Sequence, residues 1–232
     1  MDQEMKNSPL LIPASIIVSG VIIAVAVMYS GGVDLGGKKT DEKKQLSAES
    51  AGEASALLGV VGGDQVLGSP SASVTFIEFG DFQCPFCGRF YSTTEKELKE
   101  KYVKTGKVKF IWRDFAFLGQ ESFDSAVAAR CAGEQGKFWE YHNYLFEHQN
   151  GENEGAFSVA NLKNFAKILN LDASQFNSCL DSSKFLSAVQ KETELGRQLG
   201  VDGTPSSFIN GVHITGAVPF AQFEQVILDA LK

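Results

Sequence analysis

Two cysteines separated by two residues are the side chains in this 232-residue chain best suited to chemistry. Cys84 and Cys87 flank Pro85 and Phe86, and two thiols three positions apart at a helix start form a strained, reducible disulfide. Pro85 suits a first helical position, which puts Cys84 where the helix dipole and unpaired backbone N–H groups stabilise a thiolate. Cys87, one turn further in, is expected to be more buried and to act as the resolving thiol. The pair predicts thiol–disulfide exchange.

Zinc binding is the first alternative for such a pair. A structural zinc site needs two further ligands at suitable spacing, yet Cys131 and Cys179 stand alone and the three histidines form no pair. His142 and His148 are six positions apart on one predicted helix, a spacing that does not share a face. We therefore expect no metal and no other cofactor, and keep two inert structural cysteines as a second alternative.

The elements around the pair predict a parallel crossover. Val74–Phe79 is β-branched and aromatic, as in a buried strand, and a helix is expected from Pro85 to about Tyr102. A second strand follows at Lys107–Phe115. Two strands joined by a helix of this length imply a right-handed parallel connection. Arg113-Asp114, at the end of the second strand, is expected to be a solvated pair.

A long stretch without strand signals comes next. Apolar residues three and four apart predict helices at Ser122–Gly133, Lys137–His148, Val159–Leu169, Ala173–Asp181 and Lys184–Leu199. Strands are expected at Ser206–Ile209 and Val212–Thr215, around an Asn210-Gly211 turn, and a final helix opens at Pro219. This order predicts an α/β sheet with a helical insertion at about residues 119–199.

Three motifs now resemble a known family. They are Asp81-Phe-Gln-Cys-Pro-Phe-Cys87, the Gln135–His142 helix, and Gly203-Thr-Pro-Ser-Ser-Phe-Ile-Asn-Gly211. Together they resemble the DsbA-like branch of the thioredoxin superfamily, over residues 64–232. The resemblance implies a thioredoxin fold with an inserted helical domain. It also implies a thiol:disulfide oxidoreductase that introduces disulfides into unfolded or reduced extracytoplasmic proteins and is re-oxidised by a membrane oxidase.

The resemblance implies roles in the site for individual residues. Thr204-Pro205 matches the cis-proline loop of the family, which lies against the cysteine pair and, with Pro85 and Phe86, is expected to contact substrate. Glu78 matches a buried acid beneath the site. From the residues alone, Glu78 either faces solvent or is a buried carboxyl with a raised pKa; as a buried acid it would accept the Cys87 proton during exchange.

Phe86 stands where the strongest oxidants of the family carry histidine. Without an imidazolium beside Cys84, stabilisation of the thiolate depends on the helix terminus. We therefore expect a less extreme oxidant.

Cys131 and Cys179 lie on the apolar sides of two predicted helices. They are either two buried free thiols or a disulfide within the helical insertion. Related extracytoplasmic proteins carry an extra pair at this place, so the resemblance favours a structural disulfide.

Two other functions remain open. A disulfide isomerase or reductase of the same superfamily is one, because Thr204 before the proline is common among such isomerases. Those isomerases carry an N-terminal dimerisation domain, for which residues 31–63 are too short and too polar. A tethered peptide-binding or chaperone module with structural cysteines is the other.

The N-terminal region predicts a membrane anchor. No charged residue occurs from Asn7 to Val33, and about twenty helical residues span a bilayer core. We expect a short flank at 1–8, a transmembrane helix at 9–30 and a flexible linker at 31–63, with a cleaved signal peptide as the alternative. The run Leu57–Val61 would form an extra strand or a docking segment.

The charges that flank the predicted span and the cysteine chemistry favour opposite orientations of the folded domain relative to the membrane. Lys38, Lys39, Lys43 and Lys44 follow the predicted span and only Lys6 precedes it, so the positive-inside rule would put the folded domain in the cytoplasm. An oxidising disulfide and a second cysteine pair belong outside it. We therefore expect a single-pass cell-membrane protein with its catalytic domain on the extracytoplasmic side. The net charge of −7 argues against a nucleic-acid partner.

Overall fold

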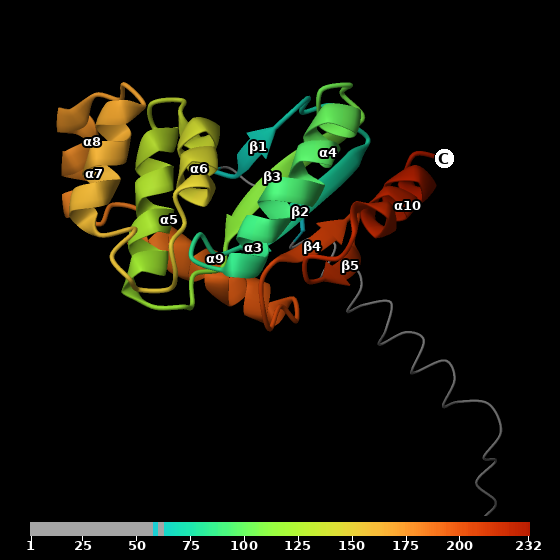
Figure 1. Cartoon of the computed structure of the whole chain (residues 1–232). Coiled ribbons are helices and arrows are strands. Elements are labelled where there is room, and N and C mark those ends of the chain that lie inside the picture. The colour runs from blue at the N-terminus through green and yellow to red at the C-terminus, as the bar shows by residue number, and fades with distance from the viewer. Residues whose placement is uncertain (1–57, 60–62) are drawn as a thin grey trace, which may run out of the picture. The chain divides into compact units, whose positions relative to one another are not determined.

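A five-stranded sheet forms the centre of the computed structural model, which describes residues 58–59 and 63–232. The strands are β1 (Gln65–Leu67), β2 (Val74–Gly80), β3 (Val108–Asp114), β4 (Ser206–Ile209) and β5 (Val212–Thr215). Their order in the sheet is β1-β3-β2-β4-β5, and the β2–β3 pair is parallel while the other pairs are antiparallel (Figure 1). The predicted parallel crossover is therefore correct.

The helix of that crossover runs from α3 (Pro85–Phe90) through η1 (Tyr91–Glu95) and α4 (Lys96–Leu98) to η2 (Lys99–Val103). The two η segments are π-helical, with wider turns than the α-helical parts. Its length agrees with the prediction. The spacing of apolar residues does not predict the π turns. It indicates which face of a helix is buried, but not which backbone carbonyl each N–H group binds.

Five helices lie between β3 and β4 in the chain. They are α5 (Gln120–Gly133), α6 (Phe138–Glu147), α7 (Val159–Ile168), α8 (Ala173–Asp181) and α9 (Leu186–Gln198). Figure 1 shows α5 to α8 grouped to one side of the sheet, whereas α9 leads back toward it. The last helix, α10 (Phe220–Ala230), begins directly after Pro219, as expected.

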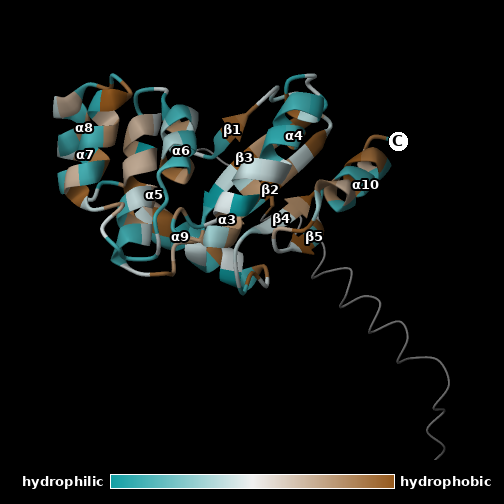
Figure 2. Cartoon of the chain, viewed as in Figure 1, coloured by the Kyte–Doolittle hydropathy of each residue, from teal (hydrophilic) through white to brown (hydrophobic). Residues whose placement is uncertain are grey.

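The sheet is covered by apolar side chains on both faces because successive strand residues point to opposite sides. Phe76 and Phe110 pack with Phe223 of α10 on one face. Ile77 and Phe208 belong to the cluster on the other. The helices carry their polar residues elsewhere, and Figure 2 shows both teal and brown residues on α7, α8 and α10.

Leu58 belongs to this second cluster, with 9 % of its surface exposed. β1 was not predicted, since a three-residue strand leaves almost no periodicity. The predicted span at 9–30 and most of the linker lie outside the described residues. Within residues 58–59 and 63–232, no helix has the length and apolar character needed to cross a membrane.

The expectation of a solvated Arg113-Asp114 pair is wrong. Both side chains are buried: Arg113 pairs with Asp64 at 3.1 Å, and Asp114 accepts a 2.5 Å bond from Arg130 of α5. Arg130 also contacts Glu192 of α9 at 2.5 Å. These partners are distant in sequence, so the strand's own residues could not reveal them.

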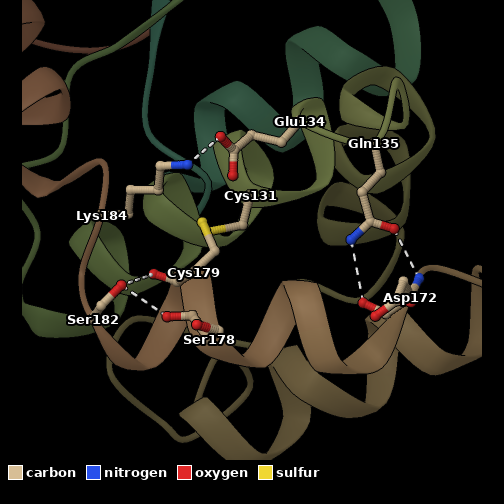
Figure 3. Close-up of a disulfide and its surroundings, with 8 residues drawn as sticks. All are labelled: Cys131, Glu134, Gln135, Asp172, Ser178, Cys179, Ser182 and Lys184. Carbon is tan, nitrogen blue, oxygen red and sulfur yellow. Dashed lines mark hydrogen bonds and ion pairs between the residues drawn. A yellow bond between two sulfur atoms is a disulfide. The ribbon is translucent and has the colours of Figure 1, made fainter.

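Cys131 of α5 and Cys179 of α8 form a disulfide in the structure, with 5.8 Å between their Cα atoms (Figure 3). Nearby, Gln135 exchanges two hydrogen bonds with the backbone of Asp172, at 2.8 and 3.2 Å. Lys184 forms an ion pair with Glu134. The disulfide therefore lies among contacts that already connect α5 to the α8 region.

Candidate active site

The cysteine pair lies at the beginning of α3. Cys84 is the N-cap residue, with an extended backbone (φ −68°, ψ 119°), and Pro85 follows at the first helical position. Both thiols are free in the structure. Cys84 is slightly exposed and Cys87 is fully buried. The geometry thus matches the expected division into an outer and an inner thiol.

Hydrogen bonding lowers the pKa of Cys84 to about 6. The largest cause is a hydrogen bond with the Cys87 thiol; burial opposes the shift, and the backbone N–H groups of Cys87 and Phe86 add to it. Burial raises the pKa of Cys87 well above its ordinary value, and the neighbouring Cys84 raises it further. In the reduced protein at neutral pH, Cys84 is therefore a thiolate and Cys87 a thiol.

Glu78 is fully buried in β2. Of the two positions that the sequence allows, a solvent-facing side chain and a buried carboxyl, the structure therefore has the second. Neither of its carboxylate oxygens has a hydrogen-bond partner among the described residues. Burial raises the pKa of Glu78 well above its ordinary range, and the nearby Glu95 raises it further. The charge of Glu78 in turn raises the pKa of Cys87, so the carboxyl and the inner thiol interact.

The loop before β4 meets the cysteine pair from across the sheet. The Thr204–Pro205 peptide bond is cis, and in its thiol form Cys84 donates a hydrogen bond from Sγ to the Thr204 carbonyl at 3.3 Å. Pro85 is exposed, and Phe86 exposes 55 % of its surface with the Arg89 guanidinium 5.0 Å from its ring centroid. The structure thus brings together all the site residues expected from sequence.

Sequence reasoning missed the role of Asp81. Its carboxylate is buried and accepts hydrogen bonds from the Gln83 backbone at 2.9 Å, the Ser122 hydroxyl at 2.8 Å and the Phe117 backbone at 3.0 Å. It therefore fixes the turn between β2 and Cys84. The one feature of the sequence that points to this role is the position of Asp81 in the motif that contains the two cysteines.

The loop between α6 and α7 supplies two further contacts that local patterns do not reveal. Gln149 donates from Nε2 to the carbonyls of Phe82, at 2.6 Å, and of Cys84, at 3.0 Å. Asn153 donates its backbone N–H to the Gln83 side chain at 2.5 Å. The insertion thus holds the segment that carries the outer cysteine.

Comparison with known proteins agrees with this geometry. The family model described as Thioredoxin matches residues 61–229. The probable disulfide bond formation protein D of Bacillus anthracis is 29 % identical over 213 residues, which cover 89 % of this chain and 91 % of that protein.

Two solved structures are also similar. The crystal structure of oxidised BdbD from Bacillus subtilis has a TM-score of 0.70 and 27 % identity, covering 74 % of this chain and 95 % of that one. That of Wolbachia pipientis α-DsbA1 has a TM-score of 0.70 and 25 % identity, with coverage of 77 % and 96 %. The chain therefore belongs to the thioredoxin family, as a DsbA-like thiol:disulfide oxidoreductase with a helical insertion in its fold.

Proposed function

We propose that this oxidoreductase introduces disulfides into reduced extracytoplasmic proteins by donating the Cys84–Cys87 disulfide. One observation carries the proposal: a helix N-terminus where the pKa of the outer thiol falls to about 6 while that of the inner thiol is raised. A stabilised Cys84 thiolate favours the reduced pair, which makes the disulfide a good electron acceptor.

The reaction proceeds through a mixed disulfide. A substrate thiolate attacks the Cys84 sulfur, so that the Cys84–Cys87 bond breaks and Cys87 leaves and takes up a proton. A second substrate thiolate then attacks the substrate sulfur of the mixed disulfide, and Cys84 leaves as a thiolate. The substrate loses two electrons to the cysteine pair. A membrane oxidase then restores the Cys84–Cys87 disulfide.

Glu78 serves the inner thiol in this scheme. It gives a proton to Cys87 when the disulfide breaks and accepts the Cys87 proton when the pair is re-oxidised. Its complete burial and the effect of its charge on the pKa of Cys87 support this role.

Substrate lies against the residues around Cys84. Thr204, the half-buried residue before Pro205, offers its backbone to an extended peptide, which pairs with it as an added strand. Pro85 and the exposed ring of Phe86 contact its side chains. The surface position of Pro85 and Phe86 supports this arrangement.

The layout of the chain completes the proposal. Residues 9–30 anchor the protein in the cell membrane, 31–63 form a linker, and 64–232 form the catalytic domain on the extracytoplasmic side. The disulfide Cys131–Cys179 has a structural role. The absence of charge from Asn7 to Val33 supports the anchor, and a second cysteine pair supports the compartment.

The test is oxidation of a reduced, unfolded protein that needs disulfides to be active. The oxidised wild-type protein should restore activity, whereas Cys84→Ala and Cys87→Ala should not. A Cys131→Ala/Cys179→Ala variant is the control and should keep the activity. Rescue of a scrambled substrate with no oxidation of a reduced one would indicate an isomerase instead. Retained function in vivo without Cys84 would indicate a peptide-binding module.

A further inference from the structure

A second group of ionisable side chains lies buried behind the cysteine pair. Glu95 of η1 forms an ion pair through Oε1 with Lys99 of η2. Glu95 is 1 % exposed, whereas the Lys99 side chain is 17 % exposed. The other oxygen of Glu95 lies 3.9 Å from Nε2 of His142 in α6, a fully buried ring. None of these residues has a role in the exchange reaction described above.

This group interacts with Glu78. The Glu95 carboxylate raises the pKa of Glu78, second in effect only to burial, and the Lys99 ammonium lowers it. The His142 ring packs edge-on against Trp112 at 4.9 Å, and Trp112 is the β3 residue paired in register with Glu78. Two buried carboxyls and one partly exposed ammonium therefore interact around Glu78.

Other groups face the same interior but leave the balance unchanged. His142 adds no charge, since burial lowers its pKa well below the usual value, and Nδ1 lies 3.2 Å from Asn143 Oδ1. The Tyr91 hydroxyl donates to Glu147 at 2.8 Å. Burial raises the pKa of Glu95, and Lys99 opposes this shift; Lys96, 5.4 Å from the Tyr91 ring, opposes it more weakly.

Charge balance then decides which carboxyl holds a proton. The single ammonium of Lys99 neutralises one carboxylate, and a second ionised carboxylate without a partner is disfavoured in an apolar interior. Lys99 forms an ion pair with Glu95, whereas neither oxygen of Glu78 has a hydrogen-bond partner among the described residues, and the ion pair is what distinguishes the two carboxyls. Burial raises the pKa of both carboxyls, but Lys99 opposes the shift directly at Glu95, and the pKa of Glu78 lies well above its ordinary value. Glu95 is thus the member of the pair that ionises first, and Glu78 the one that stays neutral.

We propose that Glu95 acts as a positioning residue: its ion pair with Lys99 neutralises the ammonium charge that would otherwise favour ionised Glu78, so that Glu78 stays protonated and can deliver its proton to Cys87. This inference rests on the proposed function. As substrate sulfur bonds to Cys84 and the Cys84–Cys87 bond breaks, the leaving Cys87 thiolate takes the proton of Glu78, which becomes a carboxylate. On re-oxidation the Cys87 thiol returns that proton to Glu78, so protons and electrons balance over the cycle.

Substitutions on the two members of the pair should have different effects. Glu95→Gln leaves Lys99 without its carboxylate, which favours ionised Glu78 and places a negative charge near Cys84. We expect the Cys84 pKa to rise by about one unit, which at about pH 8 shifts the equilibrium with glutathione about tenfold toward the oxidised protein. Lys99→Met leaves Glu78 neutral and should keep the wild-type value.

The double variant Glu95→Gln/Lys99→Met removes both charges and should return the Cys84 pKa to that of the wild type. If the pair had only a structural role, the effects of the two substitutions would add, and the double variant would differ most from the wild type. The matched control is the exposed pair Glu97 and Lys101 of the same helical run, 3.3 Å apart with the same i,i+4 spacing. Glu97→Gln should change neither the pKa nor the equilibrium.

Infrared spectroscopy tests the protonation state without disturbing the pair. At neutral pH, the wild-type spectrum minus that of Glu78→Gln should contain a protonated carboxyl C=O band. A carboxylate signal in its place would overturn the inference, as would an unchanged Cys84 pKa in a folded Glu95→Gln variant. Thiolate titration and glutathione equilibrium do not depend on the protein substrate, so failure here is distinguishable from failure in the refolding assay.

Discussion

Removal of the Cys131–Cys179 disulfide should destabilise the protein without changing its chemistry. The bond closes a segment with a sequence separation of 48. On the chain-entropy model, a loop of this size stabilises the folded state by about 4 kcal/mol at 25 °C, because the cross-link restricts the unfolded chain. This is a large share of the stability of an ordinary domain, about 5–15 kcal/mol.

Urea unfolding of the wild type and of Cys131→Ala/Cys179→Ala provides the assay. Both should be measured with Cys84 and Cys87 reduced, so that only one disulfide differs. The variant should lose about 4 kcal/mol of unfolding free energy and show a larger m-value, because its denatured state is less compact. Wild-type protein reduced at all four cysteines controls for the lost side-chain contacts.

A loss below about 1 kcal/mol would refute this reasoning, since it would mean that the unfolded chain gains little freedom when the bond is absent. Loss of thiol–disulfide exchange in a folded double variant would contradict the structural role. Because Cys84 leaves as a stabilised thiolate, a glutathione buffer should reduce Cys84–Cys87 before Cys131–Cys179.

Three further predictions concern charge. Arg130→Met should cost about 3–5 kcal/mol in urea unfolding, because Asp114 and Glu192 would lose a buried partner; a loss below about 1 kcal/mol would contradict the burial argument. Alkylation of the reduced protein should rise with pH through about 6, the Cys84 pKa, and a midpoint near the ordinary thiol pKa would refute the assigned thiolate. The pKa of Cys84 is depressed in the folded state, so the reduced protein should gain stability as pH rises from about 6 toward 9.0, the ordinary thiol pKa, and lose that gain as pH falls. Thermal unfolding measures this dependence. The oxidised protein, which lacks the thiolate, should not show it.

Sequence reasoning succeeded where a local pattern fixes a local structure. The motif Cys84–Cys87 with Pro85 placed the outer thiol at a helix N-terminus, and it lies there. The apolar, β-branched and aromatic residues of β2 and β3, with a helix between them, predicted the parallel crossover. Both depend on neighbours within a few residues.

It failed where a side chain takes its partner from a distant element. The residues around Asp114 in the sequence predict a solvated side chain, because its partner, Arg130, lies on α5. Similarly, nothing near Gln149 in the sequence indicates that its amide binds the carbonyl of Cys84. Glu78 could be placed in the interior only through the family resemblance, because a single acid in an apolar strand fits either face. The surroundings of Glu95 required the packed structure.

The reduction potential of the Cys84–Cys87 pair tests the central claim most directly. Equilibration with glutathione, followed by separation of the oxidised and reduced forms, gives its value. A disulfide donor whose Cys84 thiolate is stabilised by the Cys87 thiol and by the helix terminus, with Phe86 in place of histidine, should have a reduction potential between about −120 and −200 mV. A value near −270 mV, typical of a cytosolic reductant such as thioredoxin, would contradict the account.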